Sequence, residues 1–382
     1  MDVDEEDDRS QVLDHYPIRD IQSTLMGSSL RATLALPLTV TWLLTNMMVF
    51  FSFECVIYLA FRFYSMDLYR CYMGMVQTAW IDVIACVFPK TDIVVTGQLP
   101  TDTTKPAIIV CNHQVDADWW FLWEFMRRQN GGGNVKICLK DELKYVPVFG
   151  WGLYLMEFLY VKRNLDHDSR HVAQHMARFE DFPFWMLLFP EGTTINAESM
   201  VKSHRFAKTT NRPHLERLLL PRTAGLETIL GATQGVKPDI YDLTLSYPSY
   251  SGEVPTTAMG YSRLQDLGVP SMSSLIWGTP VDKIYLHGKK VSYDEVAGKE
   301  QAYLDGMWHE KEALLDEFIA HGAFASKQEQ DWHVLRPQTS MLGIFKLWVS
   351  AIVGFASLPL LLVWFPTTFL WSTMTTHKSK TA

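Results

Sequence analysis

Cysteine is scarce in this chain of 382 residues, and the spacings that mark metal or nucleotide sites are absent from its sequence. The five cysteines form no Cys-x-x-Cys pair and no disulfide-rich pattern, so we expect buried free thiols. No group of histidines and cysteines has zinc spacing, and no glycine-rich phosphate loop occurs. The sequence therefore predicts neither a metal nor a nucleotide cofactor. It also lacks Asn-x-Ser/Thr sequons, which disfavours a lumenal domain.

Basic charge is also in short supply. Lysine and arginine number 34 against 42 acidic residues, which gives a formal net charge of −8. No basic stripe indicates a nucleic-acid partner. Six of the acids fall within the first eight residues, so the remainder carries −8 + 6 = −2. We expect residues 1–31 to form an acidic, disordered tail.

Long uncharged runs, in contrast, indicate a membrane protein. No charged residue interrupts 32–53, and about 20 apolar residues suffice to span a bilayer, so we expect a transmembrane segment over 32–61. Residues 62–89 are predicted to be a linker that contains a membrane-dipping or amphipathic helix, with a buried helix of a soluble domain as the alternative. A second uncharged run over 347–376 contains two prolines and predicts one span or a re-entrant hairpin.

Residues near the end of the sequence resemble a localisation signal. Residues 377–382 are interpreted as a cytosolic tail, in which Lys378 and Lys380 resemble a dilysine endoplasmic-reticulum retrieval signal. Lysines that snorkel at a membrane edge are the alternative. We therefore expect a multi-segment integral protein of the endoplasmic-reticulum membrane.

Strand and helix patterns alternate through the middle of the chain. The apolar runs predict strands over 92–95, 107–111, 136–139 and 184–189, and helical periodicity predicts helices over 118–129, 168–180 and 304–319. This order predicts an α/β domain over 90–320 with a largely parallel sheet covered by helices. Membrane-embedded helices are expected on its N-terminal and C-terminal sides.

His113 and Asp118 are the strongest catalytic candidates. His113 lies two residues after the end of the predicted strand at Cys111, and Asp118 comes five residues later. On one continuous helix the two side chains would point about 140° apart. They can meet only if His113 lies in the strand-to-helix turn and Asp118 on the helix, where a carboxylate can orient an imidazole base. Asp116 is an alternative orienting residue.

The Asn-His-x4-Asp segment that contains His113, followed by the Phe-Pro-Glu-Gly-Thr segment over 189–193, resembles the glycerolipid acyltransferase superfamily. The segments 146–151, 160–163 and 220–225 are similar to further blocks of that superfamily. The segments 136–140 and 241–244 are similar to the branch of lysocardiolipin, lysophosphatidylinositol and lysophosphatidic acid acyltransferases.

This resemblance implies acyl transfer from acyl-CoA to the free hydroxyl of an anionic lysophospholipid of the lysophosphatidic acid or lysophosphatidylinositol class, at a lipid bilayer. His113 would be the general base and Asp118 its orienting partner, without an acyl-enzyme. It points to no protein partner. The substrate-binding residues implied are Arg163, Glu191, Gly192 and Thr193 for the acceptor, Pro221 for the acyl chain, and Lys140 and Lys144 for anionic groups.

Two other readings remain open. Cys111 lies two residues from His113, on the same side of a strand, so a thiol-dependent lipid hydrolase or transacylase is conceivable. A non-catalytic lipid-binding protein with a relic site is the second.

Overall fold

The computed structural model describes residues 18–162, 165–256, 266, 268–324, 332–338, 341–350 and 352–353. The chain divides into two compact units, Met1–Leu44 and Thr45–Ala382. The first unit contains the start of helix α2 (Ile18–Phe61). The predicted disordered tail is therefore wrong for residues 18–31, which contain no proline and are rich in residues that tolerate a helix. Residues 1–17 lie outside the described part.

Among the described residues, one helix is long and apolar enough to cross a membrane, the part of α2 over Thr39–Phe61. This range overlaps the predicted segment 32–61. A shorter apolar helix covers Met341–Ser350. Most of the predicted run 347–376 lies outside the described residues, as do Lys378 and Lys380.

Helix α3 (Met66–Val87) occupies most of the predicted linker and packs on the domain rather than standing alone. Ser65 caps its first turn by accepting a hydrogen bond from the Leu68 N–H. One face of the helix is buried, whereas Tyr72 and Met75 on another are exposed. Asp82, which interrupts the apolar run, forms ion pairs with Arg127 and Lys346.

An eight-stranded sheet forms the centre of the second unit, in the order β4-β3-β5-β2-β6-β7-β1-β8. Five of its seven pairings are parallel, and β6–β7 and β1–β8 are antiparallel. The strands are β1 (Asp92–Gly97), β2 (Ala107–Cys111), β3 (Val135–Lys140), β4 (Leu159–Val161), β5 (Trp185–Leu188), β6 (Asp239–Ser246), β7 (Lys283–Val291) and β8 (His333–Leu335). The prediction of a largely parallel sheet is confirmed, although β6 to β8 were not anticipated.

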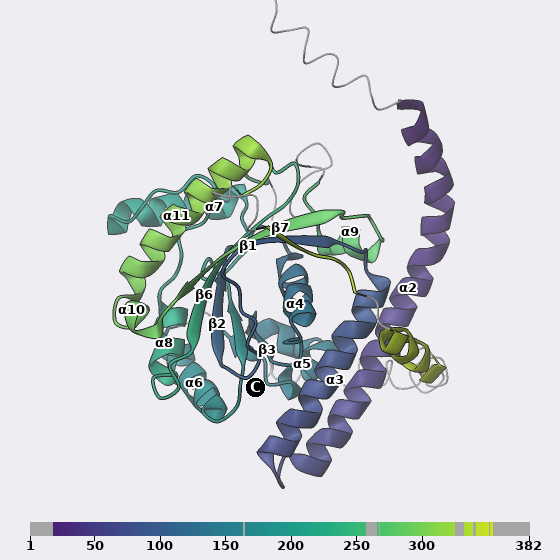
Figure 1. The fold of residues 1–382 in the computed structure, drawn as a ribbon, viewed down its shortest axis with the longest axis horizontal. Coiled ribbons are helices and arrows are strands. Elements are labelled where there is room, and N and C mark those ends of the chain that lie inside the picture. The colour runs from purple at the N-terminus through teal and green to yellow at the C-terminus, as the bar shows by residue number, and fades with distance from the viewer. Residues whose placement is uncertain are drawn as a thin grey trace, which may run out of the picture. The chain divides into compact units, whose positions relative to one another are not determined.

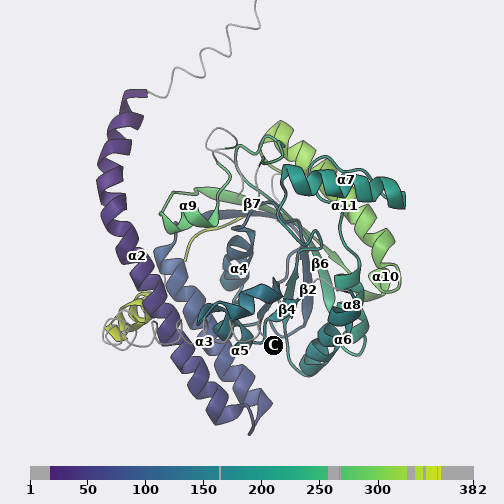
Figure 2. The same ribbon diagram turned by 180° about the vertical axis from the view of Figure 1, so that it is seen from behind.

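Helices cover both faces of this sheet (Figures 1 and 2). Those that follow α3 are α4 (Asp118–Arg128), α5 (Phe149–Leu155), α6 (Leu165–Met176), α7 (Ala197–Thr210), α8 (Ala224–Ala232), α9 (Met272–Ile276), α10 (Tyr293–Val296) and α11 (Glu300–His321), with short 3-10 helices η1 (Asp141–Tyr145) and η2 (Ala177–Phe179). Helices α6, α8 and α11 lie on one face and α4 on the other. On the first face, Met176, Leu226 and Trp308 pack with Ile108 and Ile240 of the sheet in one core.

Strand β2 lies in the middle of the sheet, between β5 and β6, and all five of its residues are buried. Burial on both faces explains its uninterrupted apolar sequence. Its register pairs Ala107 with Trp185 of β5 and with Asp239 of β6. Because the three strands are parallel, their carboxyl ends meet at one edge of the sheet.

Candidate active site

Polar side chains follow each of these three neighbouring strands at that shared edge. His113 comes two residues after β2, Glu191 three residues after β5, and Tyr247 directly after β6. Ligands of parallel α/β sheets collect outside the carboxyl ends of the strands. The fold therefore brings together three segments that are far apart in the sequence.

His113 lies in the turn between β2 and α4, as the sequence predicts. Its Nδ1 atom is 3.0 Å from Oδ2 of Asp118, and its ring stacks on Phe189 with 4.2 Å between ring centroids. Its backbone carbonyl accepts a hydrogen bond from the Ile195 N–H at 3.3 Å. With Nδ1 held by the carboxylate, Nε2 is the nitrogen that remains to accept a proton from a substrate.

Asp118 is the first residue of α4 and is fully buried. Besides His113, its Oδ2 accepts hydrogen bonds from the backbone N–H groups of Gln114 at 2.6 Å and Val115 at 2.9 Å. Its Oδ1 accepts one from the Tyr247 hydroxyl at 2.5 Å. Four donors therefore converge on one buried carboxylate and fix its position.

Asp116, the alternative orienting residue, is engaged elsewhere. Its Oδ1 accepts a hydrogen bond from the Met272 N–H at 2.9 Å, at the start of α9. Burial raises the pKa of this carboxyl. The structure therefore places Asp118, and not Asp116, against the imidazole.

Glu191 is a buried link between two loops. Its Oε1 accepts a hydrogen bond from the His113 N–H at 3.1 Å, and its Oε2 accepts one from the Leu219 N–H at 3.3 Å. Burial raises its pKa to about 8, in spite of these two backbone donors. The side chain thus connects the turn that carries His113 with the segment that precedes α8.

Asn112 holds the end of β2 against β6. Its amide donates to the Leu245 carbonyl at 3.0 Å and accepts from the Leu245 N–H at 2.8 Å. This pair of bonds replaces the backbone pairing that ends one residue earlier, at Cys111. The position of the following residue, His113, is therefore fixed by a side chain as well as by the sheet.

The sequence of this chain is similar to those of known acyltransferases. A family model described as Acyltransferase matches residues 92–232, and one described as Acyltransferase C-terminus matches residues 274–348. A probable 1-acyl-sn-glycerol-3-phosphate acyltransferase 5 of Arabidopsis thaliana is 26% identical over 290 residues, which are 74% of this chain and 72% of that protein. Lysocardiolipin acyltransferase 1 of Gallus gallus is 28% identical over 277 residues, 69% and 68% of the respective chains. The chain therefore contains an acyltransferase domain, and it is similar to glycerolipid acyltransferases.

A more distant likeness is to the crystal structure of the 1-acyl-sn-glycerophosphate (LPA) acyltransferase PlsC from Thermotoga maritima. It covers 78% of this chain and 100% of that one, at 14% identity and a TM-score of 0.43.

The predicted substrate-binding residues of this acyltransferase lie at several places on the same edge of the sheet. Gly192 and Thr193 follow Glu191 in the loop between β5 and α7, and Gly192 has a φ of +73°, which favours glycine. Pro221 is buried, and its carbonyl accepts a hydrogen bond from Arg212 at 2.9 Å. Their contact with substrate stays a prediction.

The predicted cationic residues are more dispersed. Lys140 ends β3 and is exposed. Lys144 forms an ion pair with Asp141 and lines a cavity of about 300 Å³ beside β4. Arg163 lies outside the described residues. The structure therefore does not bring Lys144 to His113 as a free cation.

Cys111 is the last residue of β2 and is fully buried. Burial raises the pKa of its thiol well above the ordinary value, which suppresses the thiolate form. Its Sγ donates to Oδ1 of Asn112 at 3.5 Å. These features disfavour Cys111 as a nucleophile.

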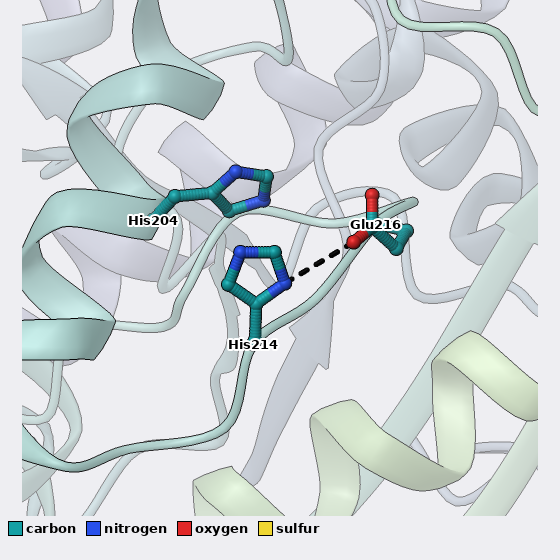
Figure 3. A group of neighbouring side chains, drawn as sticks. All are labelled: His204, His214 and Glu216. Atoms are coloured by element: carbon teal, nitrogen blue, oxygen red, sulfur yellow. Dashed lines mark ion pairs between the residues drawn. The ribbon is translucent and has the colours of Figure 1, made fainter.

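A separate polar cluster near the end of α7 consists of His204, His214 and Glu216 (Figure 3). These are ligand types that zinc prefers, and one potential ligand atom from each lies within 4.8 Å of the others. However, Nε2 of His204 already donates to the Leu215 carbonyl at 2.8 Å, the rings of the two histidines stack, and Nδ1 of His214 pairs with Glu216 at 3.1 Å. His214 and Glu216 are exposed, so these contacts account for the cluster and we assign no metal to it.

Sequence reasoning missed Tyr247 and assigned no role to Asn112. Tyr247 is fully buried, yet its hydroxyl reaches Asp118 across 129 positions of sequence. The available signal was a tyrosine that directly follows an apolar strand, at the end where ligands of α/β sheets collect. That signal has meaning only once β6 is known to pair with β2.

Proposed function

We propose that this acyltransferase transfers a fatty acyl group from acyl-CoA to the free hydroxyl of an anionic lysophospholipid, of the lysophosphatidic acid or lysophosphatidylinositol class. The observation that carries the proposal is the His113–Asp118 pair, with Nδ1 held at 3.0 Å and no hydrogen bond to Nε2 among the described residues. The names of its relatives, which specify acylglycerol-phosphate and lysocardiolipin acyltransferases, support an anionic acceptor.

In the proposed reaction, Nε2 of His113 takes the proton of the lipid hydroxyl while its oxygen attacks the thioester carbonyl. Asp118 holds the imidazole in the required tautomer and stabilises the imidazolium that forms. The tetrahedral intermediate then expels the CoA thiolate, which receives the proton from His113. The lipid hydroxyl occupies the position that a serine has in a hydrolase triad, so no acyl-enzyme is needed.

An acceptor panel tests this proposal. Membranes that contain the full chain or its His113→Ala variant are given radiolabelled oleoyl-CoA and a series of lysophospholipids. We expect transfer to lysophosphatidic acid and lysophosphatidylinositol ahead of lysocardiolipin, poor use of lysophosphatidylcholine, and a loss of about 10²–10⁴-fold in the variant. Full activity of His113→Ala would refute the mechanism, and lysophosphatidylcholine as the best acceptor would refute the anionic preference.

The same proposal includes the location. Helix Thr39–Phe61 supports a membrane anchor, and we place the protein in the endoplasmic-reticulum membrane, where the catalytic domain would face the cytosolic supply of acyl-CoA.

A further inference from the structure

Arg222 is an exposed cation beside the loop that carries Glu191. Its backbone N–H donates to the Pro190 carbonyl at 2.9 Å, and the Leu219 N–H donates to Glu191. From the other side, Arg212 donates to the carbonyl of Pro221. The backbone of Arg222 is therefore held by neighbours on both sides, which preorganises the residue.

The side chain of Arg222 extends over Gly192. A Cβ atom placed on Gly192 would lie 3.6 Å from Nε and 3.8 Å from Cζ of Arg222, so the missing side chain leaves the guanidinium close to this backbone. Among the described residues, no carboxylate forms an ion pair with Arg222. Its neighbours along the segment differ, because Arg212 pairs with Asp305 and Arg217 with Asp316.

Arg222 is also connected to the proposed base through the Glu191–Gly192 loop. Gly192 follows Glu191 directly, and Glu191 is hydrogen-bonded to the backbone of His113 at 3.1 Å. In a lysophospholipid that receives a chain at its central carbon, the free hydroxyl and the phosphate ester stand on neighbouring carbons of the glycerol. A phosphate must therefore lie near the base whenever that hydroxyl does. A guanidinium is well suited to it, because its planar fork donates two hydrogen bonds to phosphate oxygens.

We propose that Arg222 binds a substrate phosphate during acyl transfer, and that this phosphate belongs to the lysolipid or to CoA. The inference rests on the proposed function, since it assigns a phosphate ligand within the same site. Arg222 acts on binding and not on the proton transfer, so its removal should change KM much more than kcat.

The test compares Arg222→Ala and Arg222→Lys with Arg205→Ala, a matched control that removes an exposed arginine of α7. Each full-length protein is assayed with lysophosphatidic acid and with monoacylglycerol, which lacks the phosphate, while oleoyl-CoA is varied separately. A charge-assisted hydrogen bond is worth about 1.5–3 kcal/mol, so we expect Arg222→Ala to raise one KM by about tenfold to hundredfold, with partial recovery in Arg222→Lys.

A rise confined to lysophosphatidic acid assigns the lysolipid phosphate, and a rise confined to oleoyl-CoA assigns a CoA phosphate. Unchanged KM values for both substrates, or an equal effect of Arg205→Ala, would overturn the proposal. Equilibrium binding of radiolabelled lysophosphatidic acid and of oleoyl-CoA to the purified proteins gives a second readout. This readout distinguishes failure of the proposed function from failure of the role proposed for Arg222. A wild-type protein without transferase activity contradicts the proposed function. Unweakened binding of both ligands by Arg222→Ala contradicts only the role of Arg222.

Discussion

Replacing Tyr247 by phenylalanine isolates one hydrogen bond of the candidate site. The change removes the hydroxyl that donates to Oδ1 of Asp118 at 2.5 Å and keeps the ring, which packs edge-on against Phe121 with 5.7 Å between centroids. Burial raises the pKa of the Tyr247 phenol well above its ordinary value, so the hydroxyl stays a donor throughout the working pH range. The variant therefore tests whether the one donor on Oδ1 of Asp118 matters to His113.

The expected magnitude follows from the burial of the carboxylate. Asp118 is fully buried, and its Oδ1 has no other donor among the described residues, so the lost bond should cost about 1.5–3 kcal/mol of stability. Without this donor, the carboxylate that orients His113 is held by one hydrogen bond fewer, so the imidazole is positioned less firmly for proton transfer. We expect kcat to fall by about tenfold and KM to change little.

The assay measures kcat, KM and thermal stability for wild type, Tyr247→Phe and a matched control, Tyr293→Phe. The control also deletes a buried phenol hydrogen bond, to the Leu230 carbonyl at 2.8 Å, but on the α8–α10 side of the core. It should lose stability and keep the wild-type kcat and KM. If Tyr247→Phe also kept its kcat, the hydroxyl would have only a structural role.

The remaining predictions address the acids and the thiol. Asp118→Asn should reduce kcat nearly as much as loss of the base, and Asp116→Asn much less, because Asp116 binds the Met272 backbone. Single-turnover assays measure both losses, and a larger loss in Asp116→Asn would contradict the role of Asp118. Cys111→Ser should retain most activity, whereas its loss would favour the thiol mechanism. Glu191 has a pKa raised from 4.5 to about 8, so the folded chain holds a proton that the unfolded chain releases, and stability should fall as pH rises through this window. Thermal melts from pH 5 to 8 should show this slope in wild type and a smaller one in Glu191→Gln; identical slopes would contradict the assignment.

The sequence was sufficient to predict the structure where the contacts are between residues close together in the chain. His113 and Asp118 are separated by a strand-to-helix turn, and only that arrangement lets the two side chains meet, so their contact was predictable from spacing. Helix α11 also followed from helical periodicity, and strands β2 and β5 followed from their apolar runs. Strand β7 shows alternating burial of its side chains, a signal that was present and not used.

The sequence was insufficient to predict the position of a residue where that position depends on the order of strands in the sheet. Tyr247 and Arg222 gain their positions because β6 and β5 both pair with β2, and no local pattern states that pairing. The error over residues 18–31 has another origin. There, acidic composition near the start of the chain was extended into a segment that contains no helix breaker stronger than Gly27 and is helical.

Glu191 shows how a residue can matter to substrate without facing it. Resemblance to the family predicts that it binds the acceptor, but both of its carboxylate oxygens accept hydrogen bonds from backbone groups of the protein, and its side chain is buried. One of these bonds reaches His113 and the other reaches the segment that leads to Arg222. A change at Glu191 would therefore disturb the base and the proposed phosphate ligand together. Loss of activity on its substitution would not by itself show contact with the lipid, whereas the selective KM effect expected for Arg222 would.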